Sequence, residues 1–569
     1  MATSTEAADT TRRRKKRGQG KGRMVDVNAL MQVRDLLADS PRQRDLMIEF
    51  LHRIQDHYGY LSAAHIVALA HELKLGTTEV YEVATFYHHF DVVKENQQPP
   101  AALTVRVCDS VSCELAGSTP LIESLTAAMG DSVRIQAVPC VGRCSLAPVA
   151  VVGFNPVDNA TLESVSAQVN AKQVSPINPK SHISYDAYRA DGGYQIALEC
   201  HEGKRDRAQI IQLMKDSGLR GLGGAGFPAG TKWDIVSGQD APRYMAVNID
   251  EGEPGTFKDR HYIESDPHRF FEGMLIAAAV VGIAKIWIYT RDEYALGREI
   301  LESEFARLQA DPPFPLPEIE LRRGAGAYIC GEESAMIESI EGKRGLPRLR
   351  PPFVAQVGLF GRPTLEHNFE TLYWIRDFLE KGHDWFTSEG RNGRTGLRSF
   401  SVSGRVQSPG VHLAPAGITM RELIDEYCGG MLDGHEFYGY FPGGASGGIL
   451  PADLGDIPLD FDTLQPYGCF IGSAAIVVLS NQDSAKQAAL TSMRFFAHES
   501  CGQCTPCRVG TDKAAALMEA DTWDLERLED LATVMEDASI CGLGQAAPNP
   551  LRCVVKYFPH ELGLPERSS

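Results

Sequence analysis

The sequence lacks a hydrophobic run long enough to cross a membrane. A transmembrane helix needs about 18 consecutive apolar residues, and the longest candidate, residues 274–289, is interrupted by Lys285. The basic stretch at residues 12–23 has no apolar segment behind it, so neither a secretory nor a twin-arginine signal fits. We therefore expect a cytoplasmic protein without a membrane span. Residues 1–26 are expected to form a disordered basic tail, with docking on an acidic partner as the alternative.

The sequence also has fewer basic than acidic residues. The chain has 56 basic and 74 acidic residues, which gives a net charge of −18. A general nucleic-acid binder is expected to carry the opposite balance, so we expect no nucleic-acid partner. No internal repeat of solenoid length is present, which argues against a repeat architecture.

The chain has no need of disulfides to hold a small core together. It has 569 residues, of which 43% are hydrophobic, so several domains can each bury a core of their own. Thirteen cysteines are nevertheless present. Because cytosolic thiols are kept reduced, clusters of cysteines in such a chain favour metal or redox chemistry.

Hydrophobic periodicity divides the chain into helical and sheet-forming regions, and so predicts a multidomain α/β protein. Alternating apolar and polar positions predict a strand at 103–108, strands are also predicted at 244–249 and 285–290, and helical spacing dominates near both ends. The predicted units are a helical bundle at 27–98, a small sheet domain at 99–172, a linker at 173–183, a long α/β domain at 184–392, a smaller α+β domain at 393–482 and a helical domain at 483–569.

The strongest chemical motif is a cysteine cluster near the C-terminus. Cys501, Cys504 and Cys507 form C-x2-C-x2-C, and Cys541 follows 34 residues later. Three thiolates on one tight turn can reach three corners of a cubane, and a remote fourth completes it. Zinc ribbons instead place two ligands on each of two turns. The spacing therefore favours a [4Fe–4S] cluster over zinc.

A second cysteine set lies in the small sheet domain. Cys108 and Cys113 form C-x4-C, and Cys140 and Cys144 form C-x3-C. Each pair follows a predicted strand, so the two loops can meet at one end of a sheet. Four thiolates suit either a [2Fe–2S] cluster or zinc, and the spacing alone leaves both open.

Residues 218–233, GLRGLGGAGFPAGTKW, contain a literal G-x-G-x-x-G at Gly221, Gly223 and Gly226. A dinucleotide-binding loop of this type follows a strand and opens a helix. Here the preceding residues resemble a helix end, and Pro228 and Gly230 stand where the next helix should begin. We therefore predict a glycine-rich turn that approaches a phosphate or a flat ring, with Lys232 as a neighbouring cation.

Three further polar segments follow this loop. NIDEGEPGTFKDR at 248–260 follows a predicted strand and concentrates acidic residues. A second glycine-rich turn begins the segment 324–353, which ends in basic residues, and RPTLEHNFET at 362–371 adds a polar turn. Each would be unremarkable alone, but together they are typical of a binding site.

These four segments, in this order and ahead of the C-x2-C-x2-C motif, resemble the flavin-bearing NADH dehydrogenase subunit of respiratory complex I and its relatives. Residues 27–172 resemble the partner subunit of that module, a helical bundle followed by a thioredoxin-like [2Fe–2S] domain. The stretches PRQRDLMIEF, HFDVVKE and FPGGASGGILP make the whole chain most similar to the β subunit of molybdenum- or tungsten-dependent formate dehydrogenases.

The resemblance implies a Rossmann-like FMN domain at 184–392, a ubiquitin-like β-grasp domain at 393–482 and a helical [4Fe–4S] domain after it. It also implies [2Fe–2S] for the first cysteine set. The implied FMN and NADH contacts, from phosphate and ring to adenine and ribose, are Gly221, Gly223, Gly224, Lys232, Asn248, Asp250, Glu251, Gly331, Glu332, Glu333, Asn368, Phe227, Phe353 and Glu253.

Three of these residues have implied electrostatic roles in the reaction. Lys232 would stabilise the FMN phosphate or the charge of the reduced flavin, and Glu251 or Glu333 would tune the flavin potential. The sequence departs from the family pattern at Ile235, where some relatives have a stacking aromatic. It also departs at Arg350, where lysine is common, and at His367, where asparagine is common.

The function implied by the resemblance is that of an NAD-dependent oxidoreductase. Electrons from formate, oxidised on a molybdopterin-containing molybdenum or tungsten iron–sulfur α subunit, would pass through the clusters to FMN and leave as hydride on NAD+, reversibly. Two alternatives remain open. One is the diaphorase subunit of an NAD-reducing hydrogenase or the NADH dehydrogenase module of a complex I-like enzyme, and the other is a zinc-bearing scaffold without redox activity.

Overall fold

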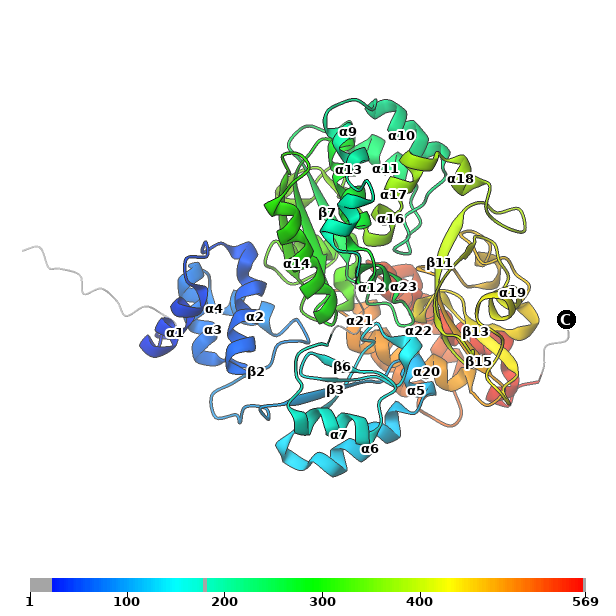
Figure 1. Cartoon of the computed structure of the whole chain (residues 1–569). Coiled ribbons are helices and arrows are strands. Elements are labelled where there is room, and N and C mark those ends of the chain that lie inside the picture. Colours follow the sequence, from blue (N-terminus) through cyan, green and yellow to red (C-terminus); the bar gives the residue numbers. More distant parts are fainter. Residues whose placement is uncertain (1–22, 178–181, 566–569) are drawn as a thin grey trace, which may run out of the picture.

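The computed structural model describes residues 23–177 and 182–565 (Figure 1). Most of the predicted basic tail and four residues of the predicted linker therefore lie outside the described part of the chain. Within that part, no helix is both long enough and apolar enough to span a bilayer.

The first domain is a bundle of four short helices, drawn in blue in Figure 1. Asp26 begins the first helix by accepting a hydrogen bond from Ala29 N at 2.8 Å, and Ser62 begins the third in the same way. A short pairing of β1 (Leu61–Ser62) with β2 (Val92–Val93) closes the bundle. The helices are α1 (Val27–Leu37), α2 (Met47–Tyr58), α3 (Ala63–Leu73) and α4 (Thr77–Ala84).

The second domain is a four-stranded sheet with helices packed on it. The strand order is β4-β3-β5-β6, and β3 runs parallel to β4, so these two strands end at the same edge. The strands are β3 (Thr104–Cys108), β4 (Arg134–Val138), β5 (Ala150–Val152) and β6 (Asn155–Val157), and the helices are α5 (Val111–Leu115), α6 (Ser118–Met129) and α7 (Leu162–Ala171).

The third domain contains a parallel sheet in the order β10-β7-β8-β9. Its central strands are buried on both sides, as expected for a parallel sheet covered by helices. The chain adds β8 and β9 on one side of β7 and then returns to add β10 on the other. The strands are β7 (Arg243–Ile249), β8 (Ile283–Thr290), β9 (Glu318–Arg323) and β10 (Thr364–Asn368).

Helices surround this parallel sheet. The longest ones, α13 and α14, connect successive parallel strands, as the crossover rule requires. In chain order the helices are α8 (Tyr185–Ala190), α9 (Gln195–His201), α10 (Arg207–Asp216), α11 (Ala229–Ser237), α12 (Lys258–Ile263), α13 (Pro267–Val281), α14 (Ala295–Ala310), α15 (Glu333–Ile340), α16 (Phe369–Tyr373), α17 (Ile375–Lys381) and α18 (Asp384–Thr387).

The fourth domain has a mixed five-stranded sheet in the order β12-β11-β15-β13-β14. Its first and last long strands, β11 and β15, are parallel neighbours at the centre, which is the β-grasp arrangement predicted. The strands are β11 (Leu397–Gly404), β12 (Gly410–Pro415), β13 (Phe437–Phe441), β14 (Leu450–Pro451) and β15 (Ala475–Ser480), with the short helix α19 (Met420–Glu422) between β12 and β13.

The last domain is helical and shares a hydrophobic core with the β-grasp domain. Its third helix buries Leu528, Ala532 and Met535, and Leu525 and Leu531 pack partly buried against the same core. The helices are α20 (Ala485–Glu499), α21 (Thr505–Met518), α22 (Leu525–Ala538), α23 (Gly542–Ala546) and α24 (Asn549–Tyr557).

The N-terminal bundle does not stand apart from the rest of the molecule. One continuous core contains Phe50 and Leu51 of the bundle, Trp287 of the parallel sheet and Phe496 of the C-terminal helices. The hydroxyl of Tyr87 also donates to the carbonyl of Lys343 at 2.7 Å. The bundle is therefore packed firmly against the sheet domain.

Candidate functional site

The candidate site is centred between β7 and β10, where the order in which the chain adds strands to the parallel sheet reverses. Strand β10 lies beside β7, and Asn368 at the end of β10 is in register with Asn248 near the end of β7. In open parallel sheets, ligands bind outside the carboxyl ends of the strands at such a switch point. Two of the predicted cofactor-binding residues therefore meet at the expected position.

The glycine loop lies against this switch point. Leu222 N donates to Thr371 Oγ1 at 2.9 Å, and a Cβ added to Gly223 would lie 3.0 Å from Asn368 Cβ. Gly224 has a φ of 122°, which a residue with a side chain rarely adopts. These glycines let the backbone come close to the end of β10, as a site for a phosphate or a flat ring requires.

The prediction that no helix opens after the loop is wrong. Helix α11 begins at Ala229, directly after Pro228. Pro228 occupies the N-cap, where its missing N–H costs nothing, and Gly230 packs against the backbone of α10. The preceding element is a helix, as predicted, so the loop joins two helices rather than a strand and a helix.

Asp250, just beyond β7, has an unpartnered polar atom. Its Oδ2 is buried without a hydrogen-bond partner in the described part of the chain, while Asn248 Oδ1 accepts from Asp250 N at 2.9 Å. Burial raises the pKa of Asp250 well above its usual range. A buried carboxyl oxygen without a partner fits a ligand that presents hydrogen-bonding groups, such as the edge or ribityl chain of a flavin.

Lys232 and Glu333 lie in one group of charges beside the loop. Lys232 Nζ donates to Glu366 O at 3.0 Å and to its Oε2 at 3.2 Å. Burial and the Glu366 carboxylate raise the pKa of Glu333, which also pairs with Arg350 at 3.2 Å. The structure thus brings these two predicted residues together, and Arg350, which also pairs with Glu332, supplies a positive charge where lysine is common in the family.

Glu251 and Glu253 lie in the same acidic turn, but their carboxylates are occupied by the protein. Glu251 accepts from the backbone N–H of Asp259 at 2.9 Å and from the hydroxyl of Tyr294 at 2.7 Å. Glu253 accepts from Ser446 N at 2.8 Å, in the β-grasp domain. Both side chains therefore hold segments of the protein together.

Sequence reasoning missed a buried charge cluster below Asn368. Lys258 Nζ lies 2.8 Å from Asp259 Oδ1 and 3.1 Å from Glu370 Oε2, and Asn368 donates to Asp259 Oδ2 at 2.7 Å. Burial raises the pKa of Asp259 to about 7. The only signal in the sequence was the polar character of two separate turns, which does not show that they meet.

Predicted stacking residues are exposed. Phe227 is 44% exposed and Phe353 is 52% exposed, and Ile235 in α11 is 42% exposed. Exposed aromatic rings are available to stack on an incoming planar group. Gly331, another predicted residue, contacts the end of β7, because its carbonyl accepts from Asn248 Nδ2 at 2.8 Å.

The four C-terminal cysteines surround one small cavity. Cys501 and Cys504 come from the turn before α21, Cys507 from its first turn and Cys541 from the start of α23. All four line the same cavity, which is closed by apolar residues that include Ile329 and Leu543. Convergence of four thiols on one point fits the predicted four-thiolate cluster.

The other cysteine set also converges. Cys140 Sγ lies 3.2 Å from Cys144 Sγ, and interactions with the thiols of Cys113 and Cys140 raise the pKa of Cys108 well above its usual range. All four are buried. The loop that carries Cys140 and Cys144 packs on the acidic turn, since Arg260 Nε donates to Gly142 O at 2.8 Å.

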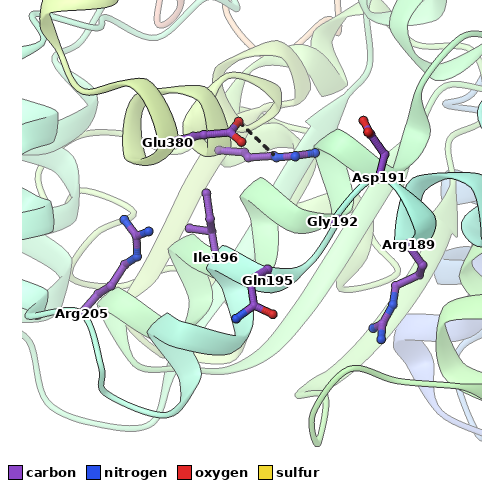
Figure 2. Close-up of a pocket in the computed structure, with 9 residues that line it drawn as sticks. Arg189, Asp191, Gly192, Gln195, Ile196, Arg205 and Glu380 are labelled. Atoms are coloured by element: carbon purple, nitrogen blue, oxygen red, sulfur yellow. Dashed lines mark ion pairs between the residues drawn. The ribbon is translucent and has the colours of Figure 1, made fainter.

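A larger surface cavity, of about 430 Å³, lies elsewhere, beside α9 and α17 (Figure 2). Three arginines line it, Arg189, Arg205 and Arg376, together with Glu380. None of the predicted cofactor-binding residues lines this cavity, so we place the functional site at the glycine loop.

Three family models match the chain. "Nuo51 FMN-binding domain" matches residues 214–377, "Thioredoxin-like [2Fe-2S] ferredoxin" matches 33–173, and "NADH-ubiquinone oxidoreductase-F iron-sulfur binding region" matches 487–564. These matches resolve the choice between iron–sulfur and zinc that the spacing of the first cysteine set left open. They also contradict a zinc scaffold without redox activity.

Relatives support the same assignment. An NADH-quinone oxidoreductase component of Rhizobium meliloti is 39% identical over 398 residues, which are 67% of this chain and 94% of that protein. The mitochondrial NADH dehydrogenase [ubiquinone] flavoprotein 1 of Dictyostelium discoideum is 40% identical over 434 residues, covering 71% of this chain and 90% of its own. The crystal structure of an NAD+-reducing [NiFe]-hydrogenase in the H2-reduced state contains a similar chain, with a TM-score of 0.81, 31% identity and coverage of 93% of this chain and 95% of that one.

These matches extend over both cysteine sets, the glycine loop and the sheet that holds it. The chain belongs to the family of the complex I 51 kDa NADH-binding flavoprotein, here fused to the thioredoxin-like [2Fe–2S] domain, and is an NAD-dependent oxidoreductase with FMN, a [2Fe–2S] and a [4Fe–4S] cluster.

Proposed function

We propose that this chain is the diaphorase subunit of a cytoplasmic NAD-dependent formate dehydrogenase. In this role it exchanges electrons reversibly between NAD and a partner subunit that oxidises formate at a molybdenum or tungsten molybdopterin centre. The observation that carries the redox function is that one short segment borders both the charges beside the glycine loop and the cavity of the C-terminal cysteines.

This segment runs from Ala327 to Glu333. Ile329 closes the cavity of the four cysteines, and the same segment ends at Glu332 and Glu333 beside Lys232 and Arg350. Glu332 also contributes to raising the pKa of Cys541, so the two regions are close enough for their charges to interact. A short separation of this kind is what electron exchange between a flavin site and a cluster requires.

The residues present fit FMN at the switch point. When bound, FMN exchanges a hydride with NAD and single electrons with iron–sulfur clusters. Lys232 would hold negative charge there, and Asp250 would bind a polar edge with its unpartnered oxygen. The residues proposed to hold FMN are Gly221, Gly223, Gly224, Lys232, Asn248, Asp250, Gly331, Glu333 and Asn368.

NADH is proposed to approach from the exposed side of the loop. Phe227 and Phe353 would stack on its adenine because their rings are accessible. Glu251 is proposed as a positioning residue, since its carboxylate holds the start of α12. Its contribution to the flavin potential would then come from its charge at a distance.

The cysteine assignments follow the two convergent sets. Cys108, Cys113, Cys140 and Cys144 are proposed as the [2Fe–2S] ligands, and Cys501, Cys504, Cys507 and Cys541 as the [4Fe–4S] ligands. The first set lies next to the acidic turn and the second next to the segment 327–333, so both clusters border the FMN domain.

Formate is proposed as the electron donor because of the similarity of the stretches PRQRDLMIEF, HFDVVKE and FPGGASGGILP to formate dehydrogenase β subunits. A second candidate is the diaphorase of an NAD-reducing hydrogenase, which the similarity to the solved hydrogenase over nearly the whole chain favours.

Copurification with the native partner distinguishes these donors. The complex is supplied with formate or with hydrogen, and NAD+ reduction is followed at the NADH absorbance band. We expect formate to reduce NAD+ and the partner to contain molybdenum or tungsten. Hydrogen-dependent reduction without formate activity would overturn the formate assignment and support the hydrogenase candidate.

A further inference from the structure

Three metal-ligating side chains converge where the N-terminal bundle meets the parallel sheet domain. His52 and Asp56 lie one turn apart on α2, and His89 lies in the loop before β2. One ligand atom from each of the three lies within 4.8 Å of the other two. The group is separate from the glycine loop and from both cysteine sets.

Each histidine is held by one ring nitrogen and leaves the other without a partner. His52 Nε2 lies 2.8 Å from Gly324 O, and His89 Nδ1 lies 2.8 Å from Asp292 Oδ2. His52 Nδ1 and His89 Nε2 are buried without a hydrogen-bond partner in the described part of the chain. The two residues are only 3% and 9% exposed, so water at the surface does not serve these atoms.

In each imidazole, the hydrogen bond made by one ring nitrogen determines what the unpartnered ring nitrogen can bind. A carbonyl oxygen only accepts, so His52 Nε2 carries the proton and Nδ1 presents a lone pair. His89 Nδ1–H donates to the carboxylate of Asp292, and its Nε2 presents a second lone pair when the ring is neutral.

One ligand atom of each side chain lies in this small region, and the two unpartnered nitrogens have no hydrogen-bond partner in the described part of the chain. Asp56 is exposed and already pairs with Arg323, so one cation would satisfy both nitrogens and take the Asp56 carboxylate as its third ligand. Each imidazole also has the outer partner that metal-ligating histidines typically have, a backbone carbonyl for His52 and a carboxylate for His89.

We propose that His52, His89 and Asp56 form a zinc site. Two imidazoles and one carboxylate, with a fourth position open to water, are a known zinc donor set. Arg323 pairs with Asp56 at 2.6 Å and with Asp292 at 2.7 Å, so carboxylate charge at the site is partly neutralised. Neutral nitrogen donors then supply most of the affinity, which favours Zn²⁺ over Ca²⁺ or Mg²⁺.

The position of the site indicates its role. All three ligands belong to the N-terminal bundle, whereas Gly324 and Asp292, which orient the imidazoles, belong to the parallel sheet domain. The ion would therefore bind best when the two domains are docked. By linkage, zinc binding stabilises that docking.

Metal analysis of the cofactor-loaded protein tests the site. The protein is washed with a chelator, equilibrated with Zn²⁺, desalted and analysed for zinc and iron. We expect wild type to hold about one zinc per chain more than His52→Gln and His89→Gln. His57→Gln, which changes an exposed histidine on the same helix, should retain that zinc, and all four proteins should have equal iron.

Two further readouts separate loss of the ion from loss of the fold. Zinc should raise the thermal midpoint of wild type and of His57→Gln but not of the other two variants. Zinc-edge X-ray absorption of wild type should show imidazole ligands at about 2.0–2.1 Å. Equal zinc in wild type and His89→Gln, with no thermal shift, would overturn the proposal and leave water or a shared proton between the imidazoles.

Discussion

Asp259 is a side chain of the candidate site whose charge is sensitive to pH. It is buried with one ammonium group, that of Lys258, and two further carboxylates, those of Glu251 and Glu370. One cation cannot balance three anions, and burial penalises each charge. These effects raise the pKa of Asp259 to about 7.

A raised pKa in a carboxyl group means that the folded protein binds this proton more tightly than the unfolded chain does. Between the unfolded value near 4 and the folded value of about 7, the unfolded chain releases the proton first, so the stability contributed by this group falls as pH rises. We expect Asp259→Asn to remove this loss. The thermal midpoint of Asp259→Asn, measured from pH 5 to pH 8, should rise relative to that of wild type as pH increases. Parallel curves for the two proteins would contradict the assignment.

Lys232 is the only cation among the residues proposed to hold FMN. A hydrogen bond to a charged group contributes about 1.5–3 kcal/mol, so we expect Lys232→Met to weaken FMN binding by about 10- to 100-fold. Flavin fluorescence after gel filtration measures the retained FMN. Lys215→Met is the matched control, because Lys215 pairs with Asp234 at 2.8 Å on the exposed side of the neighbouring helix. Equal retention in both variants would place the phosphate elsewhere.

The sequence identifies a site residue only when the partners of that residue can also be recognised from the sequence. Lys232 and Glu333 come from segments with obvious motifs, and the structure brings them together. Glu251 stands in an equally clear motif, yet its carboxylate is used by Asp259, Arg260 and Tyr294. The contact from Tyr294 comes from outside that motif, and no local pattern reports a contact of this kind.

At the scale of elements, α11 depends on a glycine that looks unfavourable in a helix. A Cβ on Gly230 would lie 2.5 Å from Lys215 N and 2.6 Å from Met214 C, both backbone atoms of α10. The two helices can pack this closely only because the side chain is missing. The loss of helix propensity at glycine is offset by this packing.

We expect Gly230→Ala to push α11 away from α10 and lower stability by about 1–3 kcal/mol. Because α11 carries Lys232, FMN retention should fall as well. Gly238→Ala at the end of the same helix provides the control, since its Cβ would meet no atom closer than 3.6 Å. Thermal unfolding and flavin content of the two variants test this, and an unchanged Gly230→Ala protein would show that the helices can separate at no cost.

Strands of the sheets were easier to predict than the start of α11. Residues 244–249 and 285–290 are apolar runs bounded by polar turns, and they form most of β7 and β8. The start of α11 was missed because Pro228 and Gly230 are usually read as helix breakers. Here one serves as the N-cap and the other as a packing surface, and only the neighbouring helix reveals this.

At the scale of the whole molecule, the [4Fe–4S] region connects the C-terminal helices to the FMN domain. We expect Cys504→Ser to abolish the electron paramagnetic resonance signal of this cluster and electron exchange with the partner subunit. NADH-dependent dye reduction should persist in part. Serine is a favourable N-cap, so α21, which begins after Cys504, should keep its start.

Cys200→Ser is the control for this experiment, because Cys200 is buried away from both cysteine sets. It should retain both activities. Complete loss of FMN from Cys504→Ser would contradict the separation of flavin binding from cluster binding.

The shared core of the N-terminal bundle and the parallel sheet domain has a consequence for how the enzyme behaves when it is dilute. Two separate polypeptides joined by such an interface would come apart as their concentration falls, following mass action. Because both sides of this interface belong to one chain, each side experiences a fixed, high effective concentration of the other. The docking of the bundle on the sheet domain should therefore be independent of protein concentration, down to single molecules.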